Sequence, residues 1–275
     1  MKSKYIKKFR HKYLDERDEL KNDVKCIENM IEKNVMNALY KDMGLETLLE
    51  KIIKNFNKTS DVDALKNKII SHGHRVYKNA IKIINNLEAK EKLSLTNNEK
   101  GIITIACMMH DIGKIYSDKN HNFYSTVIID YILSKDKNIS KDTVNSILEM
   151  VYFHSNKSKR KDKISMFAKI LRDADLFDEN CGESLFILLM TKIDNQSKNL
   201  NNVDYKVSKR LLKEKNDYIY TEKIKRKINI NVDVKLYNKL LQEATMNFYQ
   251  IVQPFEDEQS DLSKPYIYSD INIEL

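Results

Sequence analysis

Residues that interrupt helices are scarce in this chain. Its 275 residues include only 5 Gly and 2 Pro, and both prolines, Pro254 and Pro265, lie near the end. In a helix interior, glycine costs roughly 1 kcal/mol and proline about 3 kcal/mol relative to alanine, so their scarcity favours long helices. We therefore predict an all-α, mainly helical fold.

Cysteine pairs and long apolar runs are also missing. The 3 cysteines, Cys26, Cys107 and Cys181, lie far apart and form no Cys-x-x-Cys pair, which argues against a zinc ribbon or a disulfide framework. No stretch approaches the ~20 apolar residues of a membrane span, and the first residues lack the apolar centre of a secretory signal. We expect a cytoplasmic protein with no membrane partner.

Charged residues are abundant, and their balance is positive. Lys and Arg number 48 against 40 Asp and Glu, which gives a net charge of +8. With 41% hydrophobic and 32% charged residues, the chain has the composition of a folded protein. The positive charge is compatible with an anionic substrate or nucleic acid, but a Lys- and Asn-rich composition equally reflects a genome rich in A and T.

Hydrophobic periodicity divides the chain into three parts. Residues 1–60 are expected to form an N-terminal helical extension, and residues 61–180, which hold 5 of the 6 histidines, a helical core. Residues 181–275 are expected to form a C-terminal helical extension with a small accessory β element. Two segments favour paired strands because apolar and polar residues alternate in them: residues 228–234 and 271–275.

The most apolar segment of the core is GIITIACMM, residues 101–109. Its composition also suits a buried strand, but the residues around it favour a helix. Thr96 and Glu99 have the spacing of a capping box, and Gly113 is a residue type that often ends helices. We predict a central helix, apolar on all sides, that ends at His110 and Asp111.

Histidines and aspartates recur at the ends of the predicted helices or on their apolar sides. Neighbouring residues on a regular helix diverge by about 100°, so His110 and Asp111 can face one metal ion only where the helix ends. The further candidates in the core are His72, His121, His154 and Asp175. Each alone is more typical of a hydrogen-bonded interior or surface residue, and it is their order that suggests a metal site.

This ordered set resembles the HD superfamily of metal-dependent phosphohydrolases over roughly residues 65–180. The matching stretches are HGHRV, MMHDIGK, HNFYSTVI, VYFHS and LRDADLFDE. With its two additional histidines the set is similar to the two-metal branch, which includes symmetrical diadenosine tetraphosphatases and cyclic-dinucleotide phosphodiesterases of HD type. Phe153-His154 in place of paired histidines, with no Gly-Tyr-Pro after it, departs from the cyclic-dinucleotide enzymes.

The resemblance implies a binuclear centre of two divalent ions, with Fe, Mn, Co or Zn as the suitable metals. The implied ligands are His72, His110, Asp111, His121, His154 and Asp175. Asp111 would bridge the two ions, with His72, His110 and Asp175 on one and His121 and His154 on the other. His74 and Asp173 compete for the first and last places in this set.

The implied activity is hydrolysis of a phosphoester or phosphoanhydride in an anionic, nucleotide-like small molecule by a hydroxide that bridges the metal ions. Asp111 and Lys114 would be the catalytic residues, since Lys114 could neutralise a phosphate oxygen. Arg75 is expected to pair with a carboxylate and hold its helix.

Three alternatives share these residues. A di-iron oxygenase of HD type uses the same ligand order, and a non-catalytic interaction module could keep the site for structure. A nuclease acting on single-stranded nucleic acid is favoured by the basic N-terminus and by Tyr218 and Tyr220, which interleave with lysines. The sequence leaves open whether the chain forms a homo-oligomer.

Overall fold

The computed structural model describes residues 45–56, 65, 67–90, 92–134, 136–155, 164–182, 185, 186, 189, 203–231 and 233–257. Its elements are, in chain order, α4 (Leu45–Phe56), η1 (Asn67–Ser71), α6 (His72–Glu88), α7 (Asn97–Met109), η2 (Ile112–Ile115), α8 (His121–Leu133), α9 (Lys141–Phe153), α10 (Met166–Asn180), α12 (Val203–Asn216), α13 (Tyr218–Lys225) and α14 (Asp233–Asp257). These residues contain no strand, which confirms the all-α prediction. Within the same residues, no helix combines the length and apolar character needed to cross a bilayer.

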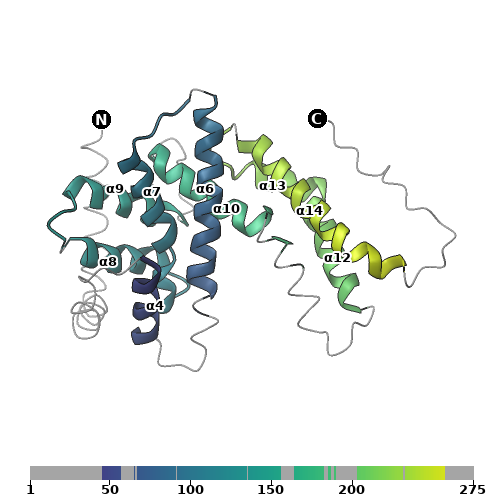
Figure 1. Ribbon diagram of the computed structural model, residues 1–275, viewed down its shortest axis with the longest axis horizontal. Helices are drawn as coiled ribbons and strands as arrows, with labels where there is room; N and C mark the ends of the chain where they lie inside the picture. The colour runs from purple at the N-terminus through teal and green to yellow at the C-terminus, as the bar shows by residue number, and fades with distance from the viewer. Residues whose placement is uncertain are drawn as a thin grey trace.

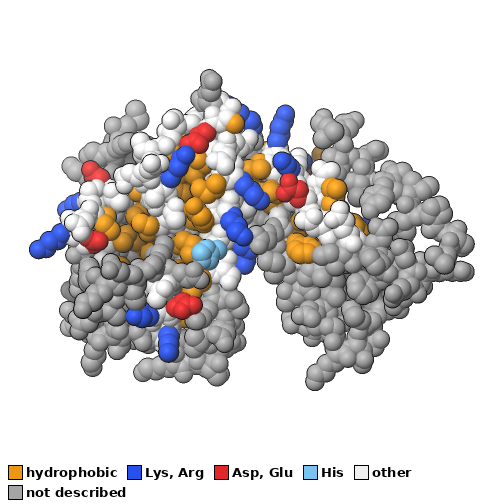
Figure 2. All heavy atoms as spheres, viewed as in Figure 1, with side chains coloured by type: hydrophobic (Ala, Val, Ile, Leu, Met, Phe, Trp, Pro, Cys, Tyr) orange, Lys and Arg blue, Asp and Glu red, His pale blue; other side chains and the backbone are white. Residues whose placement is uncertain are grey.

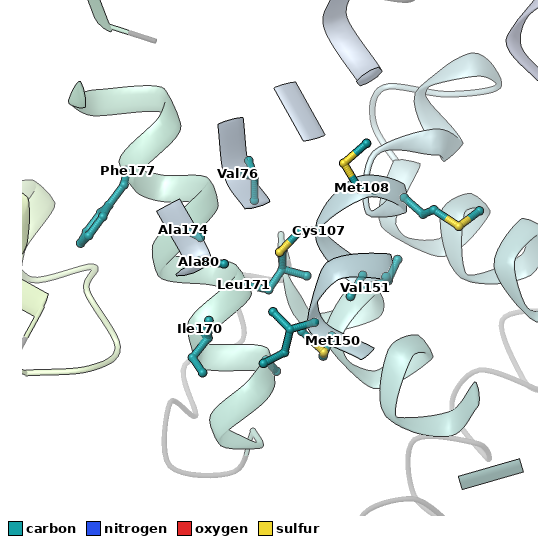
Figure 3. Packing of buried hydrophobic residues seen from close by; sticks show 14 of the residues in the cluster. Val76, Ala80, Cys107, Met108, Met150, Val151, Ile170, Leu171, Ala174 and Phe177 are labelled. Atoms are coloured by element: carbon teal, nitrogen blue, oxygen red, sulfur yellow. The ribbon is translucent and has the colours of Figure 1, made fainter. Parts of the chain in front are cut away.

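Helices α6, α7, α9 and α10 pack around one apolar core (Figure 3). The side chains that meet there include Val76 and Ala80 of α6, Cys107 of α7, Val151 of α9 and Leu171 of α10, all fully buried. Burying one such aliphatic side chain contributes roughly 1.5–3 kcal/mol. The core therefore fixes these four helices, whose ends carry the candidate ligands.

Helix α7 begins as the sequence predicts. The Thr96 hydroxyl accepts a hydrogen bond from the Glu99 backbone N–H at 3.2 Å, and the Thr96 N–H donates to the Glu99 carboxylate at 2.9 Å. This capping box satisfies N–H groups that a helix start leaves unpaired. Helix α4 packs against α7 and η2, and it buries the side chains of Leu49, Ile52 and Ile53 completely.

The end of α7 differs from the expectation for Gly113. Among the described glycines only Gly182 has a positive φ, so Gly113 provides no left-handed helix end. A Cβ on Gly113 would lie 2.2 Å from the His121 carbonyl oxygen and 2.5 Å from the Ser125 nitrogen. Glycine is needed here because η2 packs directly on α8, and its N–H donates to the Ser125 hydroxyl at 2.7 Å.

Helices α12, α13 and α14 lie together on the side of α10 opposite α8 and α9 (Figure 1). They meet the end of α10 through side chains: the Tyr220 hydroxyl donates to the Asn180 amide oxygen at 2.6 Å, and the Phe177 and Tyr237 rings lie 5.8 Å apart. Helix α14 also contacts α6. The C-terminal helices are thus packed onto the helix that carries Asp175.

The strand expected over residues 228–234 is absent, because residues 228–231 connect α13 to α14 and Asp233 begins a helix. The backbone N–H groups of Asn229 and Ile230 donate to the buried Asp173 carboxylate at 2.8 and 2.9 Å instead of to a neighbouring strand. Ile228 and Ile230 alternate because both are buried in this connection. The partner strand, residues 271–275, lies outside the described residues.

Candidate metal centre

The fold brings all six predicted ligand side chains together. His72 begins α6, His110 and Asp111 follow α7, His121 begins α8, His154 follows α9, and Asp175 lies within α10. Three overlapping groups of three among them have donor atoms within 4.8 Å of one another. Helix ends suit such a cluster because side chains there can converge from several helices on one point.

The donor atoms form two groups that share Asp111. In the first, here position A, His72 Nε2 lies 3.2 Å from His110 Nε2, 3.1 Å from Asp175 Oδ1 and 3.4 Å from Asp111 Oδ2. In the second, position B, His121 Nε2 lies 3.1 Å from His154 Nε2 and 3.4 Å from Asp111 Oδ1. One carboxylate thus offers a different oxygen to each group.

Three of these histidines are oriented by the same local contact. The Nδ1 atoms of His110, His121 and His154 lie 2.7, 2.7 and 2.6 Å from the carbonyl oxygen three residues earlier, in Cys107, Asp118 and Val151. A carbonyl oxygen only accepts hydrogen bonds, so each Nδ1 carries the hydrogen and donates. Each Nε2 then presents a lone pair to the cluster, which is the tautomer a metal ligand needs.

His72 is oriented by a carboxylate instead. Its Nδ1 donates to Asp178 Oδ2 at 2.7 Å, and Arg75 donates from Nε to Asp178 Oδ1 at 3.1 Å and from Nη2 to Oδ2 at 3.3 Å. Arg75 therefore pairs with a carboxylate, as expected. The sequence interpretation missed Asp178, although its place three residues after Asp175 puts both on one side of α10.

The donor set fits a metal cation. Lone pairs of two neutral imidazoles repel when their Nε2 atoms lie 3.1 to 3.2 Å apart, unless a cation stands between them. Nitrogen ligands about 2.1 Å from one metal ion, at right angles to each other, are about 3.0 Å apart. Imidazole and carboxylate donors together are the ligands that Fe, Mn, Co and Zn accept in proteins.

Comparison with known families identifies the same segment. The family model of the HD domain matches residues 69–180. The matched segment runs from η1 to the last residue of α10 and contains every clustered side chain. No curated protein and no solved structure matches the chain.

Charge in the cluster is set by buried carboxylates. Burial alone would raise the pKa of Asp111, but the His110, His154 and Lys114 side chains hold it well below its usual value. Burial would likewise lower the pKa of His72, yet hydrogen bonds to Asp175 and Asp178 raise it to about 10. These carboxylates therefore favour the protonated form of His72 in the metal-free chain, and a metal ion would compete with that proton.

Lys114 also lies at the cluster. Its ammonium group donates to Asp111 Oδ2, the oxygen that belongs to position A, while the Lys114 side chain is 21% exposed. The residue is thus placed between Asp111 and solvent.

The two residues that compete for the first and last ligand places, His74 and Asp173, lie outside the cluster. His74 is exposed on α6 and belongs to none of the metal-binding groups found in the described part of the chain. Asp173 is buried and binds Asn229 and Ile230. The geometry favours His72 and Asp175 over them.

Proposed function

We propose that this HD domain hydrolyses a phosphoester or phosphoanhydride bond in a nucleotide-like small molecule, with two divalent ions of Fe, Mn, Co or Zn as cofactors. The observation that carries the proposal is the shared carboxylate, since Asp111 presents Oδ1 to His121 and Oδ2 to His72 at the same distance, 3.4 Å. The HD domain match supports metal-dependent hydrolysis as the reaction class.

The chain's own residues prepare the site for such ions. When bound, two ions lower the pKa of a water molecule and balance charge on a phosphoryl group. Asp111 would hold both ions, since its two oxygens face the two histidine pairs. The Nδ1 contacts of His110, His121 and His154 hold each ring in the ligand tautomer before any metal arrives, so little reordering accompanies binding.

Lys114 supplies a cation that can change partner. Its ammonium group neutralises Asp111 in the metal-free chain. If Asp111 Oδ2 held a metal ion, the flexible Lys114 side chain could contact a phosphate oxygen of the substrate instead. Several Lys and Arg side chains lie on the face shown in Figure 2, and positive charge on a surface attracts an anionic substrate.

The nuclease alternative has weaker support. Stacking of bases needs exposed aromatic side chains. Of the two expected tyrosines, Tyr218 meets this need because its side chain is 75% exposed. Tyr220, its expected companion, instead donates its hydroxyl to Asn180 and packs against α10. We therefore favour a small phosphorylated molecule over nucleic acid as the partner, with the cytoplasm as the expected location.

Metal analysis and turnover test the proposal together. Protein purified without chelator and without oxygen should contain about two ions per chain, hydrolyse members of a nucleotide and phosphodiester panel under nitrogen, and lose both properties in D111A. Turnover that requires oxygen would replace the proposal with an oxygenase. Cleavage of single-stranded nucleic acid that weakens steeply with salt would replace it with a nuclease, and absence of metal after reconstitution would leave an interaction module.

A further inference from the structure

The two metal positions differ in the charge that surrounds them. Position A combines His72 and His110 with two carboxylate oxygens, from Asp111 and Asp175. Position B combines His121 and His154 with one carboxylate oxygen, from Asp111. Because a divalent cation is attracted by each nearby carboxylate, position A offers the stronger field.

A further carboxylate stands behind position A. Asp178 is only 4% exposed, and its Oδ2 accepts the Nδ1 hydrogen of His72 at 2.7 Å. The corresponding hydrogens of the other three histidines go to neutral backbone carbonyls. A carboxylate partner makes the opposite ring nitrogen a better electron donor and fixes the plane of the ring, whereas a carbonyl does so less strongly.

Arg75 fixes the carboxylate in turn. Its Nε donates to Asp178 Oδ1 and its Nη2 to Oδ2, at 3.1 and 3.3 Å, so the guanidinium group contacts both oxygens. His72 and Arg75 lie one turn apart on α6, while Asp178 lies on α10. The orientation of His72 is therefore held by a contact between two packed helices.

We propose that Asp178 is a positioning residue that makes position A the tighter of the two metal positions, so that the ions bind in sequence, position A before position B. The inference rests on the proposed two-metal site. Asp178 acts through His72 and touches no metal. Loss of such a partner typically weakens metal affinity roughly 10–100-fold.

The substitution that isolates this role is D178N, because Asn keeps the size of the side chain and removes its charge. The metal-free chain would be titrated with Mn²⁺ alone, in competition with a chelator of known affinity. We expect two binding steps in the unaltered chain. In D178N the first step should weaken roughly 10–100-fold, while the second step keeps its affinity.

D173N is the matched control. Asp173 is also a buried carboxylate on α10 and also accepts hydrogen bonds, from Asn229 and Ile230. Since Asp173 belongs to none of the metal-binding groups of the described residues, its substitution should lower stability without changing either Mn²⁺ affinity. D178E, which keeps the charge, should lose less affinity than D178N in the first step.

Two further variants, each lacking a ligand of one metal position, show which position accounts for which binding step. These variants test the order of binding even if D178N does not fold. H121A removes a ligand of position B, so its one remaining Mn²⁺ should bind with the affinity of the first step. H72A removes a ligand of position A, so its one remaining Mn²⁺ should bind with the affinity of the second. The reverse order, or equal affinities, would overturn the inference.

The remaining outcomes separate this inference from the proposed function. Two bound ions with both steps unchanged in D178N, or both weakened equally, would overturn the role of Asp178 and leave the two-metal site standing. An unaltered chain that binds no Mn²⁺ would overturn the proposed function itself.

Discussion

His72 and His110 turn their Nε2 atoms toward each other at 3.2 Å, although each ring already donates a hydrogen bond from Nδ1. Two imidazoles in this arrangement need a cation between them, either a proton or a metal ion. Because Asp111 and Asp175 lie within 3.7 Å of the same atoms, the surroundings favour the doubly charged ion.

Replacing His121 should remove one ion and spare the fold. H121A takes one of two imidazoles from position B, while the ligands of position A stay in place. We expect elemental analysis to give about one ion per chain where the unaltered protein holds about two. H74A is the control, because His74 is an exposed histidine outside the cluster; a loss of metal in H74A would contradict the assignment of His72.

Replacing Lys114 should affect catalysis more than metal binding. K114M removes an ammonium group that donates to Asp111. Hydrogen bonds that involve a charged group contribute about 1.5–3 kcal/mol, so kcat/KM should fall roughly 10–100-fold. Steady-state kinetics measure this, with metal content as the parallel readout. An unchanged kcat/KM would limit Lys114 to neutralising Asp111 in the metal-free chain.

Gly113 should tolerate no side chain. G113A would place a Cβ 2.2 Å from the His121 carbonyl oxygen, so α8 must shift, and overpacking of this kind costs about 1–3 kcal/mol. Urea unfolding measures the cost. Gly101, in α7, has nothing within 4 Å of a Cβ, so G101A should stabilise the protein by about 0.5–1 kcal/mol. Similar effects of the two substitutions would contradict the close packing of η2 on α8.

Glu149 should make stability depend on pH. Burial raises the pKa of this carboxyl group, only partly offset by the hydrogen bond from the Ser165 N–H. Since the folded-state pKa lies above the unfolded value of about 4.3, ionisation disfavours folding, and stability is lost as pH rises from there through the folded-state pKa. E149Q keeps the acceptor without the charge, so its stability advantage should grow between pH 4 and pH 7. Urea unfolding at both pH values measures this advantage. A stability advantage of E149Q that is smaller at pH 7 than at pH 4 would refute the prediction.

The sequence predicted features that depend on the order and local spacing of residues. The order of His72, His110-Asp111, His121, His154 and Asp175 pointed to one cluster, and Thr96 with Glu99 predicted a helix start that the structure confirms. These patterns lie within single helices or follow a family arrangement, so they need no knowledge of packing.

What the sequence did not predict depends on contacts between distant segments. Asp178 meets His72 across 106 positions of the chain, and Asp173 meets Asn229 across 56. The alternation at Ile228 and Ile230 was interpreted as a strand because a strand and an irregular buried connection can bury the same residues. Gly113 was interpreted as a helix end because the closeness of α8 is visible only in three dimensions.

The contacts of Asp173 also determine how far the chain can be shortened. The family match ends at residue 180, yet the fully buried Asp173 carboxylate takes its hydrogen bonds from Asn229 and Ile230, beyond that limit. A fragment that stops at residue 180 would leave this charge without those partners, and Phe177 without the Tyr237 ring. The smallest fragment worth expressing or grafting onto another protein therefore extends past the matched residues 69–180 to include α14.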